Sequence, residues 1–137
     1  MVLPGAMDMV NFGPPNTVPT RYANRLLYRH SPSTTLMRTT PEENAALGKW
    51  LGEKLARSKG PSVLVLPLRG FSEYDREGGV FYDPAADLAF MDAAVAALGD
   101  RAPVVRVDAR INDPDCAGQA VDMLIGLMGQ GQETHRG

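Results

Sequence analysis

The residues best placed to do chemistry lie in the segment LPLRGFSEYD, where polar residues directly follow an apolar run. Residues 63–66 read VLVL, an unbroken apolar run that predicts a strand covered on both faces by helices. Ligands of open α/β sheets bind at the carboxyl ends of such strands, which is where Arg69, Gly70 and Ser72 lie. We therefore expect these residues to belong to a ligand-binding site.

Three helix starts add a second element of this chemistry. Thr40-Pro41, Asp83-Pro84 and Asp113-Pro114 each combine a capping residue with a proline at the first helical position. The free backbone amides and the dipole of a helix N-terminus favour anions, and Arg38 and Arg69 could add bidentate donors. The predicted ligand is a phosphate or a carboxylate. No P-loop and no GxGxxG after a strand is present, so the sequence does not indicate a type of nucleotide.

Structural roles compete with these functional interpretations. We give equal weight to two roles for Arg69, which are ligand binding and a structural ion pair with Asp75, Glu73 or Asp108. Helix capping is the favoured explanation for Thr40, because a glutamate follows at the position where a capping box places it. The same capping explanation applies to the aspartate that opens the last predicted helix.

No set of residues predicts a reaction. No serine is paired with a histidine base, and no two carboxylates have the spacing of an acid–base pair. The single cysteine, Cys116, cannot form an internal disulfide, and no cysteine and histidine spacing suits zinc. The catalytic residues therefore stay unknown, and no metal site is expected.

The composition excludes several classes of partner. The chain has 137 residues, 22% of them charged, and a formal net charge of -2, which is ordinary for one globular domain. Nucleic acid is not an expected partner, because no basic cluster is present. No apolar run is long enough to span a membrane, and the N-terminus MVLPGAMDMV does not resemble a signal peptide. We expect a cytoplasmic protein without a membrane partner.

The elements that would position these residues alternate between strand and helix. Strands are predicted at 25–30, 63–66 and 103–108, and the start Val2-Leu3 resembles the end of another; helices are predicted at 41–58, 83–99 and 113–128. This order predicts an α/β fold, a three-layer Rossmann-like half with a parallel sheet of about four strands and helices on both faces. Residues 1–137 would form one domain, with a frayed polar tail at 129–137.

Five blocks of the sequence together resemble a known family. They are PGAMDMVNFGPP, LMRTTPEEN, LPLRGFSEYD, GGVFYDPAAD and INDPD, and they resemble the ATP-binding family that includes the tomato tobamovirus-resistance protein. The resemblance implies that this chain is the C-terminal lobe of a longer protein with two Rossmann-like lobes, and that ATP is a candidate cofactor. The residues in matching blocks that it implies for ligand binding are Asp8, Asn11, Arg38, Thr39, Thr40, Arg69, Gly70, Ser72, Asn112 and Asp113.

The leading functional hypothesis is a lobe that binds a nucleotide or another small anion together with a further, N-terminal lobe. An enzyme lobe acting on a phosphorylated or carboxylated metabolite and a protein-interaction module are the alternatives. We also expect a homo-oligomer, because the resemblance predicts an exposed apolar surface where the other lobe would pack. The buried face of the last helix is predicted to be Ala117, Ala120, Val121, Leu124, Ile125 and Met128.

Overall fold

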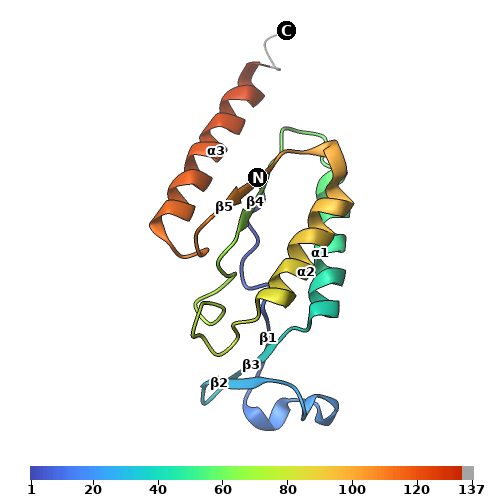
Figure 1. Ribbon diagram of the computed structural model, residues 1–137, viewed down its shortest axis with the longest axis vertical. Helices are drawn as coiled ribbons and strands as arrows, with labels where there is room; N and C mark the ends of the chain where they lie inside the picture. Colours follow the sequence, from blue (N-terminus) through green and yellow to red (C-terminus); the bar gives the residue numbers. More distant parts are fainter. Residues whose placement is uncertain (134–137) are drawn as a thin grey trace.

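The computed structural model describes residues 1–133 and has two parts (Figure 1). Three helices and a pair of parallel strands form the larger part, and a small antiparallel sheet lies at one end of it. The strands are β1 Met9–Phe12, β2 Leu27–Ser31, β3 Thr34–Arg38, β4 Leu64–Pro67 and β5 Val104–Val107. The helices are α1 Pro41–Ala56, α2 Pro84–Leu98 and α3 Pro114–Glu133, with short 3-10 helices at Pro15–Thr17, Thr20–Tyr22 and Gly99–Arg101.

The larger part is a three-layer α/β arrangement around β4 and β5. These strands pair in parallel, from Leu64 opposite Val104 to Pro67 opposite Val107, and Val2 forms one further parallel bridge to Leu64. Helices α1 and α2 cover one face of the pair, and α3 covers the other (Figure 1). The prediction of a mixed α/β fold with helices on both faces is therefore confirmed.

The prediction of a parallel sheet of about four strands is wrong. Instead, β4 and β5 form a two-stranded parallel sheet, and β1, β3 and β2 form a separate antiparallel sheet in that order. The predicted strand at 25–30 corresponds to β2, which pairs antiparallel with β3, a segment for which no strand was predicted. Residues 32 and 33 leave room only for a tight turn between them, and such a turn can join antiparallel strands but not parallel ones.

The start of α1 agrees with the sequence prediction. The Thr40 hydroxyl accepts a hydrogen bond from the Glu43 amide, and the Glu43 carboxylate accepts one from the Thr40 amide, which completes a capping box. Further along, α1 packs so closely on α2 that a β-carbon at Gly48 would overlap the backbone of Phe90. The two helices thus meet along small residues of α1, with Leu51 and Leu55 packed against the core cluster beside them.

The structure confirms the burial of Ala120 from the predicted face of α3, but most of that predicted face is turned to solvent. Cys116, Ala120, Met123 and Leu127 pack on the side of β4 and β5 opposite α1 and α2. The predicted face is instead exposed at Val121, Leu124, Ile125 and Met128. Spacings of three and four connect both sets, so periodicity alone could not choose between two adjacent faces of one helix.

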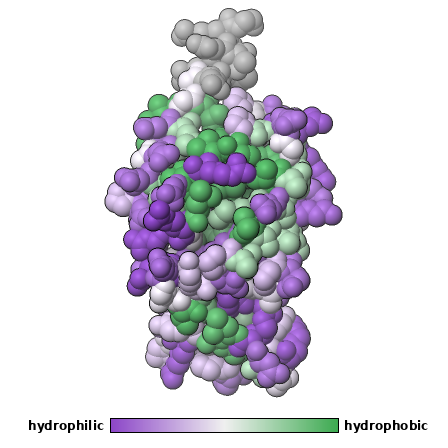
Figure 2. Space-filling view, in the orientation of Figure 1, coloured by the Kyte–Doolittle hydropathy of each residue, from purple (hydrophilic) through white to green (hydrophobic). Residues whose placement is uncertain are grey.

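Helix α3 also continues through residues 129–133, where the sequence predicted a tail, and residues 134–137 of that predicted tail lie outside the described part of the chain. Apolar surface gathers over the helices and parallel strands, with a smaller patch over the antiparallel sheet (Figure 2). Among the described residues, no helix has both the length and the apolar character needed to cross a membrane.

Candidate functional site

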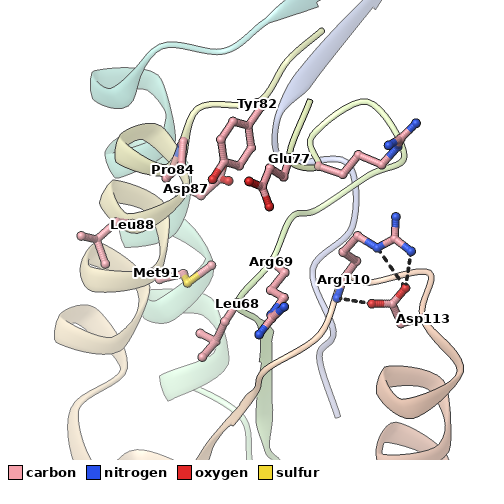
Figure 3. Close-up of a pocket in the computed structure, with 11 residues that line it drawn as sticks. Leu68, Arg69, Glu77, Tyr82, Pro84, Asp87, Leu88, Met91, Arg110 and Asp113 are labelled. Carbon is pink, nitrogen blue, oxygen red and sulfur yellow. Dashed lines mark hydrogen bonds and ion pairs between the residues drawn. The ribbon is translucent and has the colours of Figure 1, made fainter. Parts of the chain in front are cut away.

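A cleft of about 760 Å³ lies at the carboxyl ends of β4 and β5, between the first turns of α2 and α3 (Figure 3). This is the edge at which the sequence predicted a site. Arginines and carboxylates line one part of the cleft, namely Arg69, Arg76, Arg110, Glu77, Asp87 and Asp113. The apolar part of the wall consists of Leu68, Tyr82, Pro84, Leu88 and Met91.

Arg69 lines this cleft and is also part of an ion pair. Its Nε donates to Asp108 Oδ1 at 2.7 Å and its Nη2 donates to Asp108 Oδ2 at 2.9 Å. These hydrogen bonds, and then the charge of the guanidinium, hold the pKa of Asp108 below its usual value. Both side chains are well exposed, so water or an incoming anion could replace either partner at little cost.

Arg110 and Asp113 form a second pair in the wall of the cleft, at the turn that leads into α3. The carboxylate of Asp113 accepts hydrogen bonds from the Arg110 amide at 2.8 Å, from its Nε at 3.0 Å and from its Nη2 at 2.7 Å. The hydrogen bond with the Arg110 side chain is the main reason why the pKa of Asp113 is lowered. Arg76 is paired similarly, with Glu73 at 2.8 Å.

Arg38, one of the predicted ligand-binding residues, lies in the interior beside the cleft. Its Nη2 donates to Asp87 Oδ1 at 2.7 Å and reaches Asp75 Oδ1 at 3.4 Å, while its Nε donates to the Phe81 carbonyl at 2.8 Å. The side chain is only 5% exposed. This guanidinium therefore connects β3 to α2 and to the loop after β4, and no part of it lines the cleft.

Three further predicted residues bond to this buried group or to its neighbours. Ser72 donates to Asp8 Oδ2 at 2.7 Å and accepts from the backbone amides that follow it. Thr39 accepts from Arg38 at 3.1 Å and donates to the Met7 carbonyl at 2.9 Å. We define the buried cluster as Asp8, Arg38, Thr39, Ser72, Asp75 and Asp87.

The carboxyl groups of the buried cluster are hard to ionise. Burial is the main cause in each case: it raises the pKa of Asp8, it raises that of Asp87 despite the hydrogen bond from Arg38, and it raises that of Asp75 to about 7. The charge of Asp87 adds to the effect on Asp75. Despite this concentration of aspartates, no group of three or more potential metal ligands forms a metal site within the described residues.

The remaining predicted residues are spread over other positions. Thr40 caps α1, Asn11 is exposed on β1, and Asn112 is exposed beside the cleft without lining it. Gly70 has a φ of 127°, and a β-carbon there would overlap the Asp75 carbonyl oxygen, so its role in the structure is to allow this turn. Of the ten predicted residues, only Arg69 and Asp113 line the cleft.

Sequence reasoning missed several residues of the cleft wall, among them Asp87, Arg76 and Tyr82. Asp87 offered a usable signal, because it is a charged residue on the face of α2 that also carries Ala86, Phe90 and Met91, all of them buried. A carboxylate on such a face needs a buried partner. The partner itself could not be read from the sequence.

Taken together, these features define a three-layer α/β domain with a polar cleft at the carboxyl ends of its parallel strands. Residues 1–128 match the model of the uncharacterised protein family UPF0261, C-terminal domain, and the chain belongs to this family. The resemblance stated from the sequence blocks is therefore confirmed.

Relatives occur in bacteria and in plants. The chain is 54% identical over 119 residues to a UPF0261 protein of Rhizobium meliloti, an alignment that covers 85% of this chain and 30% of the relative. It is 44% identical over 129 residues to a UPF0261 protein of Clostridium tetani, covering 93% of this chain and 32% of the relative. It is 35% identical over 123 residues to the tomato ToMV resistance protein Tm-1(GCR237), covering 88% of this chain and 16% of the relative. The chain thus spans about a third or less of the length of these relatives.

Proposed function

We propose that this domain binds a small anion, a nucleotide such as ATP or another phosphate- or carboxylate-bearing molecule, in the cleft between α2 and α3. The observation that carries the proposal is the convergence of Arg69, Arg76 and Arg110 on one cleft at the carboxyl ends of β4 and β5. Guanidinium groups match phosphate and carboxylate oxygens in bidentate geometry. A volume of about 760 Å³ is within the range of pockets that hold small molecules.

The contacts of the arginines support an exchangeable site. Each of them is paired with an exposed or partly exposed carboxylate: Arg69 with Asp108, Arg76 with Glu73 and Arg110 with Asp113. Exposed ion pairs contribute little net free energy, so an anion with several charges could displace these carboxylates. The apolar wall around Leu88 and Met91 would accommodate the uncharged part of the ligand.

Sequence similarity to the tomato proteins is not a sufficient reason to propose a resistance function for this chain. The ToMV susceptible protein tm-1(GCR26) is 34% identical over the same length, 123 residues, as the resistance form. The bacterial relatives and both tomato forms thus share this domain whatever their effect on a virus. A ligand-binding role common to all of them is the simpler proposal.

Calorimetric titration of the full-length protein with ATP, and with a panel of phosphorylated and carboxylated metabolites, tests this function. We expect Arg69→Ala to weaken binding about tenfold or more, because it removes a charge-assisted bidentate contact. Arg29→Ala is the matched control, since Arg29 is exposed on β2 and does not line the cleft. Equal binding by the wild type and both variants would reject the role given to Arg69.

One observation favours an enzyme as the second candidate. Asp87 lines the cleft, and a carboxyl whose pKa is raised above its usual value is better suited to donate a proton to a bound substrate. Turnover of a phosphorylated or carboxylated metabolite by the full-length protein, abolished in Asp87→Asn but with binding retained, would support it. A complete absence of turnover across the panel, with binding intact, favours the binding function alone.

A further inference from the structure

Asp87 belongs both to the cleft wall and to the buried cluster. Its Oδ1 accepts from Arg38 Nη2 at 2.7 Å, and the same nitrogen lies 3.4 Å from Asp75 Oδ1. The carboxyl groups of Asp75 and Asp87 are both buried and thus share one nitrogen of a single guanidinium. Two carboxylates placed in this way repel each other, which favours the state in which one of them holds a proton.

The charge of the buried cluster leads to the same conclusion. Asp8, Asp75 and Asp87 would carry three negative charges if all were ionised, and Arg38 is the single cation among them. Two uncompensated charges would then remain in the interior, where desolvation is costly. Asp8 is fully buried, and its Oδ1 has no hydrogen-bond partner among the described residues. At least one carboxyl of this cluster is therefore neutral.

The protonation of the Asp75 and Asp87 pair changes the charge that an anion in the cleft would meet. Arginine and carboxylate side chains in the lining are equal in number, three of each, and the carboxylates of Asp108 and Glu73 are paired with two of these arginines. A proton on the pair removes one negative charge from the lining or from directly beside it. An anion should therefore bind more tightly when the pair holds its proton.

We propose that the cleft binds an anion and a proton together, the proton being held by the carboxyl pair of Asp75 and Asp87. The inference rests on the proposed anion site for its first ligand and adds the proton as a second one. By thermodynamic reciprocity, an anion in the cleft must increase the proton affinity of the pair by the same factor by which the proton increases the affinity for the anion.

The surroundings of the pair allow this coupling. On the interior side, the pair faces Arg38 from β3 and Asp8 from the segment before β1. Its backbone contacts are neutral, and Asn44 of α1 donates to the Ala86 carbonyl rather than to either carboxyl. The ionisable side chains on the cleft side are Arg69, Arg76, Glu77, Tyr82, Arg110 and Asp113. Because burial raises the pKa of Asp75 to about 7, the pair changes its protonation in the neutral range.

A test without any ligand uses a fixed charge in the cleft wall. Leu88 lines the cleft with 56% of its side chain exposed, so Leu88→Glu adds a negative charge there and Leu88→Gln is its neutral match. Carbon-13 NMR of labelled aspartate carboxyl groups in the full-length protein should show a resonance with a midpoint near pH 7 that is missing from Asp75→Asn and Asp87→Asn. We expect Leu88→Glu to raise this midpoint by about half a pH unit or more over Leu88→Gln.

A glutamate at Ala96 controls for a general charge effect, because Ala96 is exposed near the other end of α2 and does not line the cleft. Ala96→Glu should leave the midpoint within about 0.2 units of the wild type, since exposed charges at that separation are screened. Equal midpoints in Leu88→Glu and Leu88→Gln, or aspartates that all titrate below pH 5, would overturn the coupling even if anions bind.

The ligand arm measures protons directly. The full-length protein is titrated calorimetrically with sulfate and with ATP at pH 7.5, in two buffers of different ionisation enthalpy. Sulfate keeps its charge throughout this pH range. We expect the wild type to take up a substantial fraction of a proton per bound anion and Asp87→Asn to take up correspondingly less. Any protonation of ATP itself cancels in the difference between the two proteins. Equal uptake would overturn the inference. Absence of binding by every anion would instead overturn the proposed function and leave the NMR result to decide the charge coupling.

Discussion

Gly70 lies so close to Asp75 that a β-carbon on Gly70 would overlap the Asp75 carbonyl oxygen. The φ of Gly70, 127°, is a second reason why another residue is strained there. The contact closes the loop after β4 and lets the Phe71 amide donate to Asp75 Oδ2 at 2.9 Å. A backbone position that does not line the cleft thus helps to hold the buried cluster in place.

Gly70→Ala should lower the free energy of unfolding by more than about 3 kcal/mol, because it combines backbone strain with a steric overlap. Urea denaturation of the domain measures the change. Gly60→Ala is the control, since a β-carbon on Gly60 meets no atom within 4 Å, and it should change stability by less than about 0.5 kcal/mol. Similar stabilities for the two variants would contradict the assigned role of the Gly70 turn.

Arg38→Met should destabilise the domain by about 3–5 kcal/mol at pH 8, because it leaves the buried carboxyl groups without their cation. The loss should be smaller at pH 5, where these groups accept protons more easily. Arg29→Met on exposed β2 is the matched control. A loss that is the same at both pH values would show that packing rather than charge sets the importance of Arg38.

The stability of the domain should fall as the pH rises from about 4 to about 7. Asp75 has a pKa of about 7 in the folded chain against 3.8 as its usual value, so in this range the folded state binds more protons than the unfolded state. The slope for one such group is at most about 1.4 kcal/mol per pH unit. Unfolding at pH 5, 6, 7 and 8 should show the decline in the wild type and a flatter profile in Asp75→Asn.

Asp122→Asn, an exposed change on α3, should keep the slope of the wild type. Glu43, Asp108 and Asp113 have lowered pKa values, so they make stability increase with pH, and they do so at and below their usual pKa values rather than between pH 5 and pH 7. Stability that increases between pH 5 and pH 7 would therefore mean that Asp75 ionises normally.

Thr40→Ala tests whether this residue caps a helix or binds a ligand. Loss of the capping hydrogen bond to the Glu43 amide should reduce the free energy of unfolding by about 1 kcal/mol, while ATP affinity stays unchanged. Thr20→Ala, on an exposed 3-10 turn, should have little effect on either. Reduced affinity with unchanged stability would assign Thr40 to the ligand site instead.

Asp108→Asn should strengthen anion binding by several-fold, because it frees Arg69 from a bidentate partner and removes a negative charge near the cleft. The stability of the fold should hardly change, since both side chains are exposed. Calorimetric titration with ATP at two salt concentrations measures the effect, which should shrink at high salt. Weaker binding by Asp108→Asn would mean that Asp108 positions Arg69 for the ligand rather than competing with it.

Local chemistry explains what the sequence could predict. The starts of all three long helices were predictable because each has a proline at its first position, and Thr40 and Asp83 cap their helices within one turn. The expected capping by Asp113 is wrong, since its carboxylate accepts from Arg110 instead. The apolar run at 63–66 likewise predicted β4, and with it the edge where the cleft lies. The hairpin of β2 and β3 was missed because its turn contains no glycine or asparagine, which are the usual signals.

The site could be predicted only in part because its contacts are not local. Arg69 and Asp113 follow predicted elements directly and do line the cleft. Arg38 meets Asp87 across 49 residues, and nothing in either segment specifies the other. A polar residue next to a conspicuous motif can therefore bond to other residues of the domain instead of lining the site. Arg38, Thr39 and Ser72 are examples.

The long separation between Arg38 and its carboxyl partners also affects synthesis. Arg38 leaves the ribosome well before Asp75 and Asp87, which follow 37 and 49 residues later. Until α2 has emerged, Asp87 is not present to compensate the charge of the guanidinium, so burial of Arg38 would be costly. We therefore expect the hairpin of β2 and β3 to dock only after α2, which is encoded downstream of it, has been synthesised.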